Sequence, residues 1–194
     1  MARTKLSDEL KQAISLLSNK EKDKLLFRLI AKDSALVEKL TFELLEDTGS
    51  KDERREEIYE MIDKGFERYR YYSPGYLLLT LRSISGDINR HVKTTKDKYG
   101  EIQLNLLMLN KSLGLFGENI RKAPPRKQLT FNTYVVKRAV KLVGLLRKLH
   151  EDYLLDFQED IQKLGQHIDA QPRMKYLTEE FRLDIKMLKR GEVY

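Results

Sequence analysis

The feature that most constrains the fold is a run of apolar residues at helical spacing between residues 133 and 168. Successive members are three or four positions apart, so they form one stripe along an α-helix. No proline interrupts the run. The spacing predicts a single helix over 133–168, roughly 54 Å long at 1.5 Å per residue. The stripe consists of Val135, Ala139, Leu142, Leu146, Leu149, Tyr153, Phe157, Ile161, Leu164 and Ile168.

The two halves of this predicted helix differ in how much apolar surface they carry. The first half has a second stripe, formed by Val136, Val140, Val143 and Leu145, and a helix that is apolar on two sides is expected inside the protein. The second half, from Tyr153 to Ile168, is apolar on one side only and needs a cover. That cover is either a C-terminal helix, through Phe181, Ile185 and Leu188, or a second copy of the chain.

The rest of the chain also has helical spacing. Residues 7–47 predict three short helices with N-caps at Ser7, Ser18 and Asp33, and a capping box pairs Ser18 with Glu21. Further helices are predicted from residue 50 to about 72, from 74 to between 93 and 99 with Gly100 as terminator, over 102–116, and after residue 172. Pro124 and Pro125 predict a loop over 121–131. Segments 102–106 and 129–133 also alternate with period two, so short strands are the alternative there.

These patterns predict an all-α fold of about seven or eight helices. We expect a compact bundle or an irregular α-α superhelix built around the long helix. The whole chain, 1–194, is expected to form one helical domain. Within it, 1–47 is a candidate three-helix subunit joined through a hinge at 48–50.

Composition narrows the setting of the protein. The chain has no cysteine, which excludes disulfides and thiol catalysis and suits a reducing compartment. The longest stretch without a charged residue is 71–81, 11 residues, whereas a membrane span needs about 20. The first residues lack the apolar core of a signal peptide. We therefore expect a soluble, cytoplasmic protein without a membrane span.

Positive charge is concentrated in the middle of the chain. Residues 73–149 contain 15 Lys and Arg against four Asp and Glu, a net charge of +11, whereas 1–72 carries −1 and 150–194 carries −3. If the basic side chains converge, they form a surface for phosphate groups. The alternative is dispersed solubilising charge, or pairing with the acidic flanks. The candidate anion-binding residues are Arg121, Lys122, Arg126, Lys127, Lys137, Arg138 and Lys141.

Aromatic and basic residues alternate around the turn at 73–75. Such a mixture stacks nucleic-acid bases or forms the centre of a protein interface. The alternative is that the tyrosines fill a corner between helices with their hydroxyls in water. The residues of this aromatic joint are Arg68, Tyr69, Arg70, Tyr71, Tyr72 and Tyr76.

Catalytic and metal-binding patterns are missing from the sequence. There is no nucleophile motif, phosphate loop or dinucleotide fingerprint. Of the three histidines, only His91 has a carboxylate, Asp87, at a spacing suited to a metal, and one such pair falls short of the three or four ligands of a zinc site. The acidic residues between 151 and 160 fit a solvated face better than an acid–base pair. We expect no enzyme activity, no cofactor, no bound metal and no small-molecule ligand.

The sequence thus favours an interaction protein. The expected function is that of a non-enzymatic helical adaptor or scaffold, which binds a protein partner or associates with itself. The alternative is binding of a nucleic acid or another polyanion through the basic middle region, 73–149.

Overall fold

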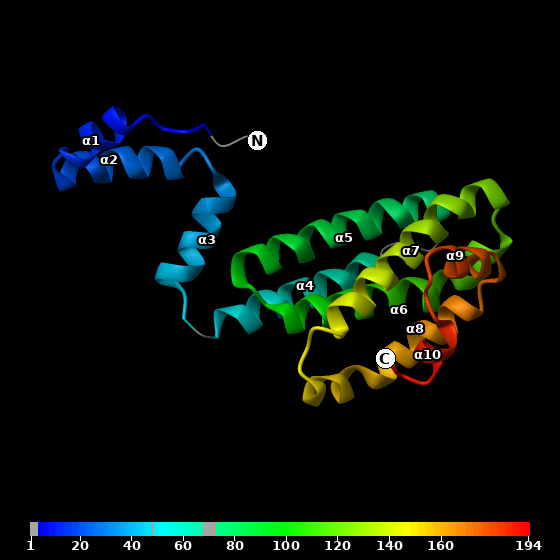
Figure 1. Cartoon of the computed structure of the whole chain (residues 1–194). Coiled ribbons are helices and arrows are strands. Elements are labelled where there is room, and N and C mark those ends of the chain that lie inside the picture. Colours follow the sequence, from blue (N-terminus) through cyan, green and yellow to red (C-terminus); the bar gives the residue numbers. More distant parts are fainter. Residues whose placement is uncertain (1–3, 48, 68–72) are drawn as a thin grey trace. The chain divides into compact units, whose positions relative to one another are not determined.

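The computed structural model describes residues 4–47, 49–67 and 73–194, and these residues form ten α-helices, two short 3-10 helices and no strand (Figure 1). The all-α prediction is confirmed. Segments 102–106 and 129–133, where strands were the alternative, are helical. The chain divides into two compact units, 1–47 and 48–194, and each is described by itself.

The N-terminal unit consists of three short helices. All three N-caps expected from the sequence are present, because each cap side chain accepts a hydrogen bond from the first turn of its helix. Glu21 also closes the predicted capping box on Ser18. Local sequence signals therefore set where these helices begin. They are α1 (Asp8–Ser15), α2 (Asn19–Ile30) and α3 (Ser34–Leu45).

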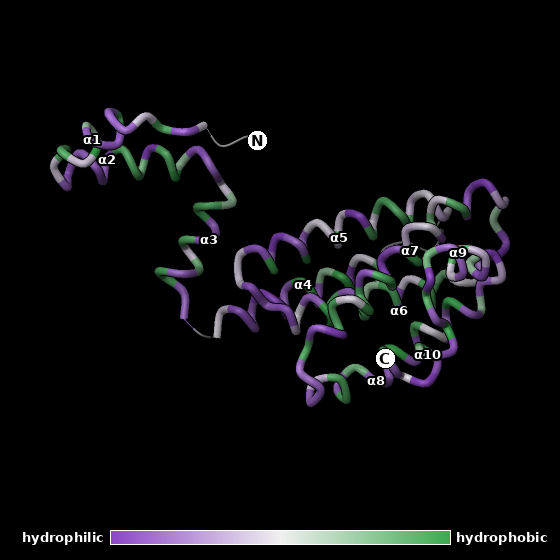
Figure 2. The backbone as a smooth tube through the Cα atoms, in the orientation of Figure 1, coloured by the Kyte–Doolittle hydropathy of each residue, from purple (hydrophilic) through white to green (hydrophobic). Residues whose placement is uncertain are grey.

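These three helices contain no buried residue. Apolar and hydrophilic residues are interleaved along all of them (Figure 2). The best covered apolar side chains, such as Ile14, Leu25 and Ile30, are only half-buried. The unit therefore has no core within the described residues. Its most exposed apolar side chains are Leu16 at 86%, Leu45 at 82%, Leu44 at 73% and Phe27 at 66%.

The second unit has a large apolar core built around α6 (Lys98–Lys122). This helix contacts four others, and Leu104, Leu106, Met108 and Leu109 along it are fully buried. A helix that is apolar on several sides is expected at the centre of a fold. Around it pack α4 (Ser50–Glu67), α5 (Pro74–Thr95), α7 (Pro125–Leu146) and α8 (Leu154–Asp169), followed by α9 (Lys175–Glu180) and α10 (Ile185–Lys189); the 3-10 helices are η1 (Glu151–Tyr153) and η2 (Pro172–Met174).

The predicted long helix over 133–168 is wrong. Helix α7 ends at Leu146, and α8 begins only at Leu154. A straight helix of that length would carry the second half of the stripe away from the core. The break lets α8 turn back and pack along α6 and α10. Most of the predicted apolar residues are covered in both halves, but Tyr153 is 50% exposed and Val140 of the second stripe is 37% exposed. The central helix of the unit is α6.

The local chemistry of the break explains why the helix stops there. The N–H groups of Lys148 and Leu149 bond to carbonyls three residues earlier, which tightens the last turn of α7. His150 then takes an extended conformation, with φ −64° and ψ 143°. The next helical turn opens with Glu151 and Asp152, where the helix dipole favours anions. Basic residues before the break and acidic residues after it are the sequence signal for two helices.

The apolar face of α8, the second half of the predicted stripe, is covered by other parts of the same chain. Phe157, Ile161, Leu164 and Ile168 of α8 are buried. Helix α10 contributes buried Leu188, while Phe181 and Ile185 are partly buried against the core. The expected C-terminal cover is thus present, and the stripe on α8 gives no reason to expect a second copy of the chain.

Helix α5 ends within the predicted range of 93–99, but the predicted terminator Gly100 and the predicted loop over 121–131 are wrong. Helix α5 ends at Thr95, where Lys96 adopts a left-handed conformation with φ 59°, and Gly100 lies in the first turn of α6 rather than terminating α5. The loop predicted over 121–131 shrinks to residues 123–124, because α7 begins at Pro125. Proline suits the first turn of a helix, where its missing N–H costs no hydrogen bond.

A membrane span was excluded at the sequence level by the lack of a long apolar run. Among the helices of the described residues, none combines the length and the apolar character needed to cross a membrane.

Candidate anion-binding site at the α6–α7 corner

Four of the predicted anion-binding residues gather where α6 ends and α7 begins. Arg121 and Lys122 are in the last turn of α6, and Arg126 and Lys127 are in the first turn of α7. The short connector holds the two pairs together. Gln128 fixes the corner, because its side-chain amide donates hydrogen bonds to the backbone carbonyls of Arg121 and Ala123 at the end of α6.

The other three predicted residues lie elsewhere on α7. At 1.5 Å per residue, Lys137 is roughly 16 Å and Lys141 roughly 22 Å along the axis from Arg126. Lys141 Nζ lies 2.8 Å from Glu101 Oε1, and Lys137 Nζ lies 4.9 Å from the centre of the Phe181 ring. Both cations therefore already have intramolecular partners. The seven residues do not form one surface.

Arg138 is a separate case. It is half-buried on α7, and its Nε and Nη2 atoms are enclosed without a hydrogen-bond partner. Burying an unpaired guanidinium group costs free energy, because water is lost without replacement. None of the pockets described below includes Arg138 in its lining.

Two cations at the corner are free of carboxylates. Glu118 lies 3.8 Å from Arg121 and 3.7 Å from Lys122, and Arg121 also donates to the carbonyl of Ala170. By contrast, Arg126 and Lys127 form no ion pair with any residue that the structure describes. The positive charge available to an external anion is therefore concentrated at the start of α7.

A pocket of about 480 Å³ opens beside this start of α7. Arg126 lines it from α7 and Arg173 from η2, which packs against α7. Arg173 lies outside the basic middle region and was missed, because only the tertiary structure brings residue 173 next to residue 126. The remaining lining residues are Pro125, Gln128, Leu129 and Asn132.

The wall of the pocket contains two buried amides. Gln128 is 2% exposed and Asn132 is 1% exposed. The side-chain amide of Gln128 donates hydrogen bonds to backbone carbonyls at the end of α6, but the Oδ1 atom of Asn132 has no hydrogen-bond partner. Buried polar atoms in native proteins are nearly always paired, so an unpaired one that lines a pocket calls for an explanation.

The aromatic joint is mostly outside the described residues. Arg68, Tyr69, Arg70, Tyr71 and Tyr72 belong to the segment that is not described. Tyr76, on the first turn of α5, is 70% exposed. A second pocket, of about 360 Å³, is lined by the start of α5 at residues 73–75 together with Arg126 and Lys127. The structure thus places the beginning of α5 next to the basic corner.

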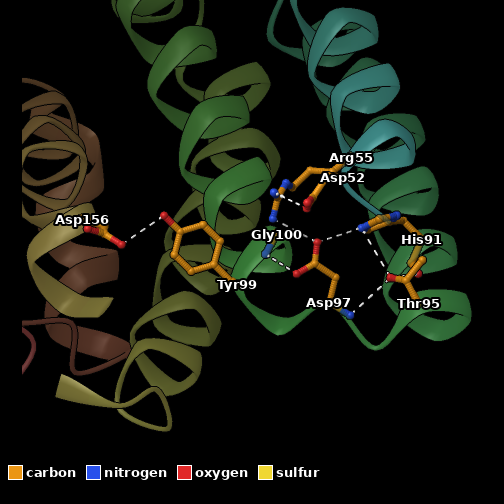
Figure 3. A network of polar contacts seen from close by, with 8 residues as sticks. All are labelled: Asp52, Arg55, His91, Thr95, Asp97, Tyr99, Gly100 and Asp156. Carbon is orange, nitrogen blue, oxygen red and sulfur yellow. Dashed lines mark hydrogen bonds and ion pairs between the residues drawn. The ribbon is translucent and has the colours of Figure 1, made fainter. Parts of the chain in front are cut away.

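A buried polar cluster lies at the turn between α5 and α6 (Figure 3). Asp97 accepts hydrogen bonds from the Gly100 N–H at 2.9 Å and from His91 Nε2 at 3.2 Å, and it faces Arg55 Nη1 at 3.4 Å. Burial alone would raise the pKa of Asp97. The hydrogen bonds from His91 and Gly100 and the charge of Arg55 outweigh that effect, so its pKa lies below the ordinary value.

This cluster connects helices and is closed to a substrate. The side chains of His91 and Asp97 are only 2% and 3% exposed. Arg55 brings α4 to the turn, and the Tyr99 hydroxyl donates to Asp156 at 3.2 Å, which ties α6 to α8. A histidine and a carboxylate in contact resemble part of a catalytic arrangement, but a reaction needs access that these two lack.

The metal-binding pair considered from the sequence does not form. Asp87 Oδ1 lies 3.4 Å from Arg90 Nη1, while His91 turns inward to Asp97. Within the described part of the chain, no three His, Asp or Glu side chains are grouped so that they could hold a metal ion.

Comparisons with protein-family models, with curated proteins and with solved structures found no match for this chain. The fold and the arrangement of side chains are therefore the basis for proposing a function.

Proposed function

We propose that the protein is a non-enzymatic helical interaction protein that associates with itself through helices α1–α3. One observation carries this proposal. These helices have defined caps and amphipathic sequences but bury no residue within the described structure. A folded helical unit with every apolar side chain at least partly exposed is typical of a surface that is completed by association.

The energetics favour the same interpretation. Isolated helices of 8–12 residues are marginal in water, so helices this short depend on packing. Burying one large apolar side chain contributes about 1.5–3 kcal/mol. Within the unit this stabilisation is largely missing for four exposed side chains, those of Leu16, Phe27, Leu44 and Leu45. A partner surface that covers them would stabilise both the association and the helices themselves.

Charge favours a second copy of the chain as that partner. Residues 1–47 contain nine Lys and Arg and nine Asp and Glu, a net charge of zero. Residues 48–194 contain 28 against 21, so the whole net charge of +7 lies there. Two neutral units of mixed charge do not repel one another. A two-fold dimer pairs the same patch on both copies, which such a surface allows.

Two of the polar sites in the described residues support the non-enzymatic part of the proposal. The cluster around Asp97 is closed. The pocket at the α6–α7 corner is lined by arginines and amides, without the histidine or carboxylate that would act as a general base.

Binding of a nucleic acid or another polyanion through 73–149 is less well supported than association. Lys141 is paired with Glu101, Lys137 lies over Phe181, and Arg121 and Lys122 share Glu118. A phosphate backbone needs a continuous row of free cations, because each phosphate neutralised adds to affinity.

Light scattering after gel filtration tests the proposal on the full chain. We expect a mass above the 22.9 kDa of one chain at micromolar concentrations, decreasing toward that value on dilution. The double variant Leu16→Ser, Phe27→Ser should shift the equilibrium toward the monomer by at least about tenfold, because two exposed apolar anchors are lost.

Leu155→Ser is the matched control. Leu155 is 75% exposed on α8, in the other unit, so the same kind of change there should leave the mass unchanged. A chain that remains monomeric up to about 100 μM, a dissociation constant typical of weak complexes, would refute self-association.

A further inference from the structure

We propose that the pocket beside the start of α7 binds the phosphate group of a phosphate monoester, as carried by a small metabolite. The pocket is lined by Arg126, Arg173, Gln128 and Asn132, with Pro125 and Leu129 as its apolar part. This inference is independent of the proposed association, because it concerns a different unit and different residues. A small-molecule ligand was not expected from the sequence.

The first argument is unbalanced charge. Arg126 and Arg173 line the same pocket, and no carboxylate does. Within the described residues, neither arginine forms an ion pair or a side-chain hydrogen bond. Two guanidinium groups that share a pocket repel each other, and an anion between them removes that repulsion. The planar guanidinium fork matches the oxygen spacing of phosphate.

The second argument is the uncapped start of α7. Its N-cap is Pro124, which supplies no side-chain hydrogen bond. Pro124 and Pro125 carry no N–H, and the N–H groups of Lys127 and Gln128 bond to the Pro124 carbonyl. The Arg126 N–H is therefore the donor that this first turn leaves to a ligand, at the positive end of the helix dipole. Since Arg126 is in this first turn, its side chain and the end of the helix attract an anion to the same place.

The third argument is the unpaired amide in the wall. Asn132 lines the pocket, is 1% exposed, and has an Oδ1 atom without a partner. The unpaired Oδ1 atom is an acceptor, so its partner is a hydroxyl group of the ligand beside the phosphate, whereas only the N–H₂ group of this side chain can donate to a phosphate oxygen. A ligand therefore satisfies a buried group that the protein leaves unsatisfied.

Charge and size select the class of ligand. A phosphate monoester carries close to two negative charges at pH 7, whereas a phosphodiester or a carboxylate carries one. Two arginines and a helix start thus match a monoester better. The volume of about 480 Å³ falls within the range of small-molecule pockets, about 300–1,000 Å³. Leu129, which is 58% exposed, offers an apolar contact to the rest of the molecule.

An NMR titration of the full chain tests the proposal. The probes are glycerol 3-phosphate as the monoester, inorganic phosphate, dimethyl phosphate as the diester, and a single-stranded RNA. With glycerol 3-phosphate, added to about 10 mM to detect weak binding, we expect saturable shifts of the backbone amides of Arg126 and Lys127 and of the Asn132 side-chain amide. Dimethyl phosphate should bind more weakly, and the affinity for the monoester should fall several-fold from pH 7 to pH 5, because its second pKa is about 6.

Variants assign the binding to the pocket. Arg126→Met together with Arg173→Met should weaken glycerol 3-phosphate binding by at least about tenfold, since each removes charge-assisted hydrogen bonds. Both side chains are exposed and unbonded, so the fold should persist, and circular dichroism checks this. Lys148→Met is the matched control, because Lys148 is an exposed cation outside the pocket, and the affinity should stay unchanged.

Four outcomes would overturn the proposal. The first is that neither glycerol 3-phosphate nor inorganic phosphate causes saturable shifts, and the second is that dimethyl phosphate binds as well as glycerol 3-phosphate. The third is that the double variant binds glycerol 3-phosphate with unchanged affinity. The fourth is that the RNA binds whereas glycerol 3-phosphate does not. The last result would favour the polyanion alternative. Inorganic phosphate that binds as well as glycerol 3-phosphate supports a phosphate site in which the ester part makes no contact.

Discussion

Asp97 combines three structural roles in one side chain. It caps α6 through the Gly100 N–H, accepts a hydrogen bond from His91 at the end of α5, and faces Arg55 on α4. Gly100 allows this close approach, because a Cβ atom there would lie 2.2 Å from the Asp97 carboxylate and 2.8 Å from the Arg55 side chain. Three helices are thus connected at one buried carboxylate.

Replacing Asp97 by Asn should remove the negative charge of this side chain and keep its role as the N-cap of α6. Asparagine caps a helix about as well as aspartate, so the bond to Gly100 is kept. The bonds to His91 and Arg55 lose their anionic acceptor. We expect a loss of about 1–3 kcal/mol at pH 7, which lowers the melting temperature by several degrees. Asp184→Asn is the control, since Asp184 caps α10 at an exposed position and should change little.

The effect of Asp97→Asn should depend on pH. The pKa of Asp97 is lower in the folded protein than in the unfolded chain, so on acidification the unfolded chain binds a proton first. The stabilising contribution is therefore complete above the ordinary aspartate pKa and is lost as pH falls through the lowered value. Melting temperatures of the two proteins should converge in strong acid. A constant difference at every pH would show that the charge of Asp97 does not stabilise the fold.

At the level of elements, the contact between α8 and α10 depends on Gly165. A Cβ atom at this position would lie 2.7 Å from the Lys189 backbone nitrogen and 2.8 Å from the Leu188 carbonyl carbon. These are backbone atoms, so α10 as a whole would have to move away. This glycine allows α10 to cover the stripe on α8 that the sequence left open.

Gly165→Ala should therefore destabilise the protein by about 1–3 kcal/mol, the usual cost of overpacking. Gly144→Ala is the matched comparison, because a Cβ there has nothing within 4 Å. In α7 that change should stabilise by about 0.5–1 kcal/mol through higher helix propensity. Thermal or urea unfolding measures both. Similar effects of the two substitutions would contradict the close packing of α8 and α10.

On the scale of the whole molecule, the two units differ in how their helices are held. The 48–194 unit has a core of fully buried residues around α6, whereas α1–α3 bury none. Local opening free energies follow buried contacts. Hydrogen exchange should therefore be slowest in α6 and orders of magnitude faster in α1–α3 in dilute protein.

Concentration should change this exchange pattern. If α1–α3 associate, their amides become protected as protein concentration rises, because binding stabilises the folded form. Amides in α6 should not respond. Slow exchange in α1–α3 at the lowest concentration would show that these helices are stable without association.

The sequence by itself determined the helical class, the caps of the first three helices and the apolar faces. These features are local: Ser18 and Glu21 are three residues apart, and the stripe on α8 repeats every three or four residues. The break between α7 and α8 was missed because both stripes stay in phase across it. The change from basic Arg147 and Lys148 to acidic Glu151 and Asp152 was the only local sign.

The tertiary structure alone decided the candidate site. Seven cations that looked alike in the sequence have different surroundings, since Lys141 meets Glu101 whereas Arg126 meets no carboxylate in the described structure. Arg173 joins Arg126 only because η2 packs on α7, and Asn132 is a buried wall residue of the same pocket. The burial of a side chain and its ion-pair partner depend on contacts between residues that are distant in the sequence. Apolar periodicity and helix capping depend on residues a few positions apart, so these two features could be predicted from the sequence alone.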